Sequence, residues 1–181
     1  YYEDEGSIDN RALTAALAVA CKNLGVRIYP DCEVLEILVQ EEAARGVRTR
    51  EGDFNSAIVI NSAGAWAGKI AGEVEQVDIN PVKGQMLMLD CNGFEEKLPR
   101  HTIYSHQTYL VPRRDGRVIV GATVEDKGFD KSVEPAAIEA LHQKAAGMFP
   151  FLGDIQPRES WAGLRPMGKQ DVPYIGALSP S

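Results

Sequence analysis

One arginine stands among apolar residues near the end of the chain, where it needs a partner. In SWAGLRP, residues 160–166, Trp161, Ala162 and Leu164 are apolar, and Gly163 leaves room for a close approach to Arg165. Arginine is almost never fully buried without a partner. An internal Asp or Glu is one candidate for that partner, and a bound anion is another.

A second stretch could bring a ligand against the backbone. Residues 57–60, AIVI, form a continuous apolar run, which is typical of a strand covered on both faces. The segment NSAGAW, residues 61–66, follows directly, and ligands of open α/β sheets sit at such strand ends. A tight strand-to-helix turn without a ligand would give the same pattern.

The common catalytic and metal-binding motifs are absent from the sequence. We find no H-E-x-x-H, G-x-S-x-G, P-loop or G-x-G-x-x-G, so we expect no metal site and no serine-type hydrolysis. Of the three histidines, His101 and His106 flank Tyr104, and we predict that His142 lies on the exposed side of a helix. The three cysteines are scattered and predict buried thiols in a reducing cytoplasm.

Composition narrows the class of protein. Of the 181 residues, 44% are hydrophobic and 25% charged, with a net charge of −7 and no basic stripe, so we expect a globular domain that does not bind nucleic acid. No apolar run approaches the roughly 18 residues of a membrane span, and no signal peptide opens the chain. Because the first residue is Tyr1, we expect a fragment of a longer protein.

The first part of the chain predicts a mixed α/β arrangement. Asp9 can cap a helix that Gly25 ends, with one apolar face. That face carries Leu13, Leu17, Ala20 and Leu24. Short strands are expected over residues 26–29, 33–39, 46–49 and 57–60.

The second part predicts an α+β arrangement. Residues 82–89 form a long strand, and Asp115-Gly116 joins strands 108–111 and 117–120 into a hairpin. A helix begins near Ser132 or Pro135, ends at Pro150, and buries Ile138, Leu141, Ala145 and Met148. A last strand, 159–164, stops at Pro166. Strands in a row with one helix predict an antiparallel sheet covered on one side.

Five motifs in fixed order carry a resemblance to a known family. They are NSAGAW, PVKGQ, YLVPRRDGRVIVGAT, SWAGLRP and VPYIG. In this order they resemble the FAD-dependent D-amino-acid oxidase superfamily, and most closely its glycine oxidase branch, which is associated with thiamine biosynthesis. The resemblance implies the middle part of an FAD-binding domain in residues 1–78. It also implies a substrate domain in 79–166 and the start of a return to the FAD domain in 167–181.

The same resemblance implies roles for residues at the substrate. Arg165 would hold the substrate carboxylate through two parallel hydrogen bonds, and the Tyr109 hydroxyl would help to hold the substrate. Val124 would line the pocket, where its short side chain could admit larger substrates than a methionine would. The competing interpretations are an internal ion pair for Arg165 and a core position for Tyr109.

For the cofactor, the resemblance implies that Ala63, Gly64 and Trp66 lie near the flavin and that the backbone of Val34 meets the adenine. Core packing is the alternative for Trp66. The family's Gly-rich FAD motif and its C-terminal FAD segment would lie outside residues 1–181. We therefore expect FAD in the full-length protein, and a fragment that is inactive and without FAD.

The expected function is oxidative deamination of a small amino acid: glycine, sarcosine or a small D-amino acid. Hydride transfer to the flavin would give an oxo acid, ammonia and hydrogen peroxide. The alternatives are an amino-acid dehydrogenase of the same superfamily, the flavoprotein domain of an RNA-modifying enzyme, and a non-catalytic carboxylate-binding module. We expect a small amino acid as the only partner class, with no membrane, and a homo-oligomer remains open.

Overall fold

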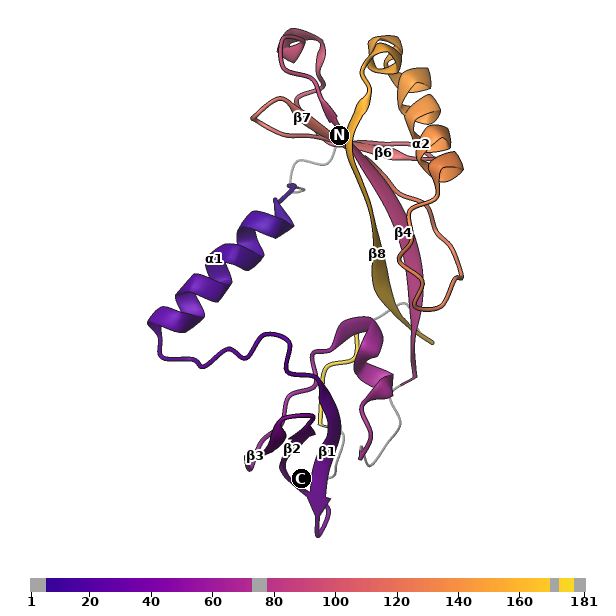
Figure 1. Cartoon of the computed structure of the whole chain (residues 1–181). Helices are drawn as coiled ribbons and strands as arrows, with labels where there is room; N and C mark the ends of the chain where they lie inside the picture. Colours follow the sequence, from indigo (N-terminus) through magenta and orange to yellow (C-terminus); the bar gives the residue numbers. More distant parts are fainter. Residues whose placement is uncertain (1–5, 73–77, 170–172, 178–181) are drawn as a thin grey trace. The chain divides into compact units, whose positions relative to one another are not determined.

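A computed structural model describes residues 6–72, 78–169 and 173–177, and the chain divides into two compact units (Figure 1). The first comprises residues 1–62, 67–77 and 175–181, and the second comprises 63–66 and 78–174. Part of the predicted tail 167–181 lies outside the described residues. The functional assignment of the three predicted segments stays a prediction.

The first unit contains a helix and a small antiparallel sheet. Helix α1, Asn10–Asn23, begins as predicted, because the Asp9 carboxylate accepts hydrogen bonds from the backbone N–H groups of Arg11 and Ala12 at 3.1 Å. Gly25 follows the helix with φ +80°, a conformation that glycine adopts without strain. The sheet has the order β1-β2-β3, with strands Val34–Gln40, Ala43–Thr49 and Gly52–Asn55.

Two predicted strands of this unit are wrong. Residues 26–29 and 57–60 belong to no strand, and Ile58 and Ile60 are 76% and 82% exposed. A strand needs a neighbour for its backbone N–H and C=O groups. Within the described residues no strand pairs with either segment. The predicted apolar face of α1 is also exposed in this structure.

The second unit is built on a five-stranded antiparallel sheet of order β5-β6-β7-β4-β8 (Figure 1). Gly116, with φ +80°, forms the predicted hairpin turn between β6 and β7. The prediction that Pro166 stops the last strand is wrong, since β8 continues beyond it. Pro166 lies opposite Pro81 on an edge strand, where a missing N–H costs no ladder bond on the open side. The strands are β4 Ile79–Asp90, β5 Ile103–Tyr104, β6 Tyr109–Pro112, β7 Arg117–Gly121 and β8 Pro157–Gly168.

Helix α2, Pro135–Met148, and the 3-10 helix η3, Pro150–Asp154, cover one face of this sheet. The core between them is apolar, as the helical pattern predicted. It comprises Leu87, Leu89, Cys91, Leu110, Val118, Val120, Leu141, Ala145 and Leu152. His142 is buried, not exposed as predicted, because its Nε2 is hydrogen-bonded to the carbonyl oxygen of Leu152 at 2.8 Å. Two further 3-10 helices are η1, Gly64–Lys69, and η2, Glu95–Lys97.

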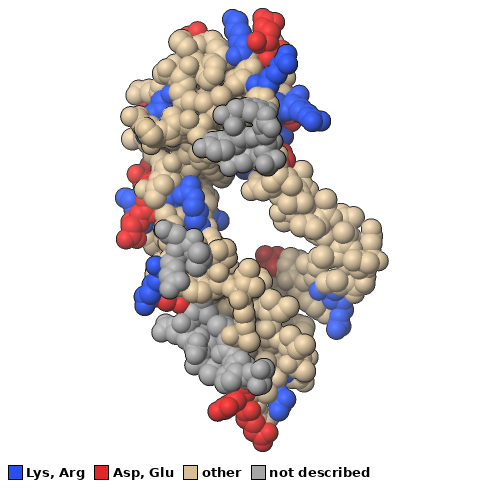
Figure 2. Space-filling view, turned by 180° about the vertical axis from the view of Figure 1, so that it is seen from behind, with Lys and Arg blue, Asp and Glu red and all other residues tan. Residues whose placement is uncertain are grey.

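The charged side chains are interspersed on the face shown in Figure 2, where basic and acidic residues lie singly or in small mixed groups. None of the helices formed by residues 6–72, 78–169 and 173–177 is long and apolar enough to cross a membrane.

Candidate substrate site on the five-stranded sheet

The alternation of β4 gives the five-stranded sheet two chemically different faces. Leu87 and Leu89 point into the core beneath α2, and the alternate residues Gly84, Met86 and Met88 point to the opposite face. The strand register places Tyr104, Tyr109, Gly121, Met86 and Trp161 in one row across the sheet. We call the face opposite α2 the arginine face, because Arg165 also lies on it.

Arg165 lies flat against the sheet because Gly84 has no side chain. The guanidinium covers the position that a Cβ of Gly84 would take, with Nη1 and Nη2 at 2.8 and 2.7 Å from it. Arg165 is half-buried, and its Nη1 donates to the carbonyl oxygen of Thr123 at 3.2 Å. Over residues 6–72, 78–169 and 173–177, no Asp or Glu forms an ion pair with Arg165. The internal ion pair that the sequence left open is therefore not found within this part of the chain.

Tyr109 is held beside Arg165 by a second glycine. The Tyr109 hydroxyl lies 2.7 Å from where a Cβ of Gly121 would be, so the ring rests directly on that residue. Burial raises the pKa of the Tyr109 hydroxyl, and the nearby Arg165 guanidinium opposes the increase through its charge and a hydrogen bond. The hydroxyl also lies 4.0 Å from Sδ of Met86. Tyr109 thus presents a neutral O–H next to a fixed positive charge.

Val124 lies in the short segment that follows β7, and it is 76% exposed. Its neighbour Thr123 is the residue whose carbonyl oxygen holds Arg165. The structure therefore brings Arg165, Tyr109 and the Thr123–Val124 backbone into one part of the second unit. The role of Val124 as a pocket wall stays a prediction.

The predicted cofactor residues are divided between the two units. Ala63, Gly64 and Trp66 belong to the second unit, and Val34 belongs to the first, where it begins β1 opposite Thr49.

The backbone at Gly64 has open space beside it. Gly64 has φ +56°, and no heavy atom lies within 4 Å of the position its Cβ would take. Trp66 is 43% exposed, and its ring packs against Phe129 with centroids 5.7 Å apart. Open space beside backbone and an exposed aromatic ring are compatible with the flavin that the family implies.

Sequence reasoning missed the residues that orient Arg165 and Tyr109. Gly84, Gly121 and the Thr123 carbonyl act through positions that only the strand register reveals. One signal was present, because a glycine inside a long strand often marks a close approach by another group. Gly84 in PVKGQ is such a glycine.

The mixed α/β fold with its antiparallel sheets matches that of a known family of flavin-dependent enzymes. Residues 1–181 match the family described as FAD dependent oxidoreductase, and the chain belongs to that family. The predicted D-amino-acid oxidase type of fold is thereby confirmed.

Three individual relatives show how similar the chain is to known members of this family. The glycine oxidase of Pseudomonas aeruginosa is 34% identical over 180 residues, which are 98% of this chain and 49% of that protein. The bifunctional protein ThiO/ThiG of Synechocystis is 36% identical over 178 residues, 97% of this chain and 26% of that protein. Among solved structures, the glycine oxidase of Bacillus cereus has a TM-score of 0.79 at 30% identity, covering 91% of this chain and 45% of that one. The chain thus spans less than half the length of each of these relatives.

Proposed function

We propose that the protein containing this chain oxidises a small amino acid, namely glycine, sarcosine or a small D-amino acid. The observation that supports this proposal is Arg165, a half-buried guanidinium laid on Gly84 beside a tyrosine hydroxyl. The similarity to two glycine oxidases supports the substrate class. We further propose that this chain by itself retains neither FAD nor activity, since it covers less than half of those relatives.

The chain's residues would bind and orient the substrate. Arg165 offers two parallel N–H donors to the α-carboxylate, a charge-assisted contact of about 1.5–3 kcal/mol. Tyr109, kept protonated by its raised pKa, can donate its O–H to the same carboxylate. Val124, exposed next to Thr123, would limit the size of the substrate side chain.

Bound FAD would supply the acceptor for the hydride that leaves the α-carbon, and oxygen would then be reduced to hydrogen peroxide. Water hydrolyses the imine product to the oxo acid and ammonia. What the protein contributes is position and electrostatics, because a carboxylate fixed at Arg165 also fixes the neighbouring α-carbon.

Arg165→Ala in the flavin-loaded protein tests this proposal. We expect KM for the amino acid to rise about 10- to 150-fold with flavin content unchanged, as the loss of one charge-assisted contact implies. Arg158→Ala is the matched control, since Arg158 also lies on β8 but pairs with Asp90 at an exposed site. Hydrogen peroxide formation separates an oxidase from a dehydrogenase, and the isolated chain should show no flavin absorbance. An Arg165→Ala protein with wild-type KM would refute the assignment.

A further inference from the structure

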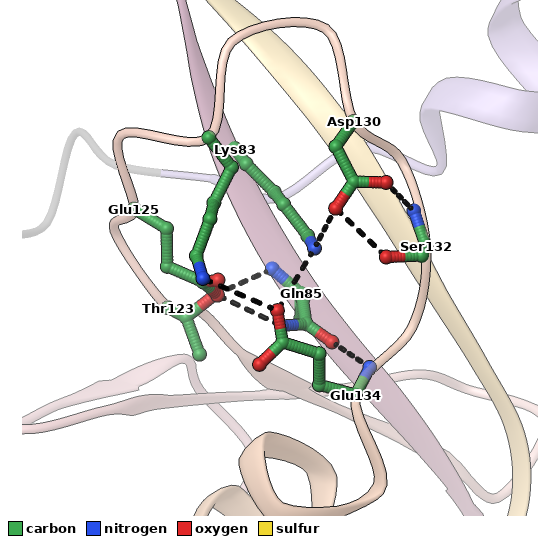
Figure 3. A network of polar contacts seen from close by, with 8 residues as sticks. Lys83, Gln85, Thr123, Glu125, Asp130, Ser132 and Glu134 are labelled. Atoms are coloured by element: carbon green, nitrogen blue, oxygen red, sulfur yellow. Dashed lines mark hydrogen bonds and ion pairs between the residues drawn. The ribbon is translucent and has the colours of Figure 1, made fainter.

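A buried lysine, Lys83, lies next to Gly84 on β4, and strand alternation turns it to the core face of the sheet. Figure 3 shows it in a network of polar side chains. Lys83 of β4 is 0% exposed, and its Nζ donates to Asp130 at 3.1 Å and to Glu134 at 3.4 Å. Burial alone would lower the pKa of Lys83, but the hydrogen bonds and charges of these two carboxylates outweigh it and raise the pKa. The lysine is therefore a charged group, tied to the loop before α2.

Gln85, two residues further along β4, connects this loop to the segment after β7 (Figure 3). Its side-chain oxygen accepts from the backbone N–H of Glu134 at 2.7 Å, and its Nε2 donates to Glu125 at 2.8 Å. Its backbone N–H donates to the hydroxyl of Thr123 at 2.8 Å, and that hydroxyl in turn donates to the Glu125 carboxylate. Gln85 is fully buried, so these bonds are shielded from competing water.

The segment held in this way is the one that contacts Arg165. The backbones of Lys83 and Glu125 exchange two hydrogen bonds of 2.9 Å, and Thr123 N–H donates to the Gln85 carbonyl at 3.2 Å. The Thr123 and Glu125 side chains both join the network behind the sheet. The carbonyl oxygen of Thr123 is left to accept from Nη1 of Arg165. Thr123 therefore belongs to both, because its hydroxyl joins the network and its carbonyl oxygen holds the arginine.

Stabilisation of the fold is not enough to explain why this strand carries a buried polar network. At the next positions of the same face, β4 carries Leu87 and Leu89, which fill the core without polar partners. Apolar residues of similar volume often stabilise a core as well as a buried ion pair does. In the part of the chain that the structure describes, every buried side-chain nitrogen and oxygen has a partner, as a network that fixes one geometry requires.

We propose that Gln85 and Glu125, backed by Lys83, are positioning residues that hold the Thr123 carbonyl where it orients the Arg165 guanidinium toward substrate. The inference rests on the proposed function, because Arg165 is the substrate contact through which the network acts. These residues touch neither substrate nor cofactor, and they work by fixing one hydrogen-bond acceptor.

Glu125→Ala in the flavin-loaded protein tests the inference. Because Glu125→Ala loosens the Thr123 segment without removing its carbonyl, Arg165 keeps part of this bond, and we expect KM for the amino acid to rise about 3- to 10-fold, with kcat and flavin content near wild type. Glu125→Gln, which keeps an acceptor for Thr123 and Gln85, should restore a KM near wild type. Glu139→Ala is the matched control, since it removes an equal charge from the exposed surface of α2.

A double mutant separates positioning from simple support of the fold. If Glu125 acts through Arg165, then Glu125→Ala should add no further increase in KM in an Arg165→Ala background. If Glu125→Ala impairs folding, Thr123→Val replaces it, because that change removes only the hydroxyl link and should raise KM in the same direction. A wild-type KM in the folded variant, or an additive effect in the double mutant, would overturn the inference while leaving the role of Arg165 intact. A wild-type KM in Arg165→Ala alone would instead overturn the proposed function.

Discussion

Gly84→Ala should displace Arg165 without changing any group that touches the substrate. A Cβ at Gly84 would lie 2.7–2.8 Å from Nη1, Nη2 and Cζ of the guanidinium, closer than real Cβ atoms approach. The backbone of Gly84 cannot move away, because β4 is paired with β8 on one side and, further along, with β7 on the other. The flexible arginine side chain must therefore shift, and its bond to the Thr123 carbonyl must lengthen or break.

The size of the effect follows from what the shifted guanidinium loses. One charge-assisted hydrogen bond is worth about 1.5–3 kcal/mol, which corresponds to about 10- to 150-fold in KM. Since Arg165 keeps its charge and can re-form part of the contact, we expect an increase of about 10-fold, at the low end of this range. Thermal stability should change little, because an alanine in a strand loses less backbone entropy on folding than a glycine.

The assay is steady-state kinetics of the flavin-loaded protein, with flavin content and melting temperature measured on the same samples. Gly163→Ala is the matched control, because Gly163 lies opposite Gly84 on β8 and no heavy atom lies within 4 Å of its Cβ position. Its effect on KM should be clearly smaller. Equal increases in the two variants, or none in Gly84→Ala, would show that Gly84 does not seat the arginine.

Two further predictions concern the isolated chain. The backbone N–H and hydroxyl of Ser132, then Lys83, lower the pKa of Asp130 to about 2, so its stabilising contribution is complete above the unfolded value of about 3.9 and is lost as the pH falls toward 2. Asp130→Asn should flatten thermal stability over this acid range, and an unchanged pH profile would contradict the assignment. Burial, and then the charge of Asp90, raise the pKa of Cys91 to about 11, so a thiol reagent at neutral pH should modify Cys91 far more slowly than the other two cysteines. Equal rates for all three thiols would contradict it.

Short sequence patterns correctly predicted the elements that depend only on neighbouring residues. The Asp9 cap, the Asp115-Gly116 turn and the apolar stripe of α2 each depend on residues a few positions apart, and each is found in the structure. The predicted strands at residues 26–29 and 57–60 were wrong, because a strand also needs a partner that lies elsewhere in the chain. Residues 57–60 have the composition of a buried strand, but composition does not supply the neighbouring strand that must pair with them.

His142 shows the same limit within a helix. Its neighbours Leu141 and Ala145 were placed in the core by their spacing, and a histidine between them suggested the solvent side. The structure buries it because the chain turns back after α2 and brings the Leu152 carbonyl within hydrogen-bonding distance. Because this carbonyl lies outside residues 135–148, the helical periodicity could not predict the hydrogen-bond partner of His142.

The candidate site combines both kinds of information. The motif around Arg165 predicts a carboxylate-binding arginine through family resemblance. The reason that Arg165 lies flat on the sheet is Gly84 on the neighbouring strand, 81 positions earlier in the sequence. A strand register fixes such relations, because a slip of one residue would turn Arg165 and Gly84 to opposite faces. On the core face the Gln85 side chain binds Glu125, and the Lys83 backbone exchanges two hydrogen bonds with Glu125, in the segment whose Thr123 carbonyl reaches Arg165. In the proposed arrangement, Gly84 seats the guanidinium on one face of the sheet, and Lys83 and Gln85 fix from the other face the segment that holds it.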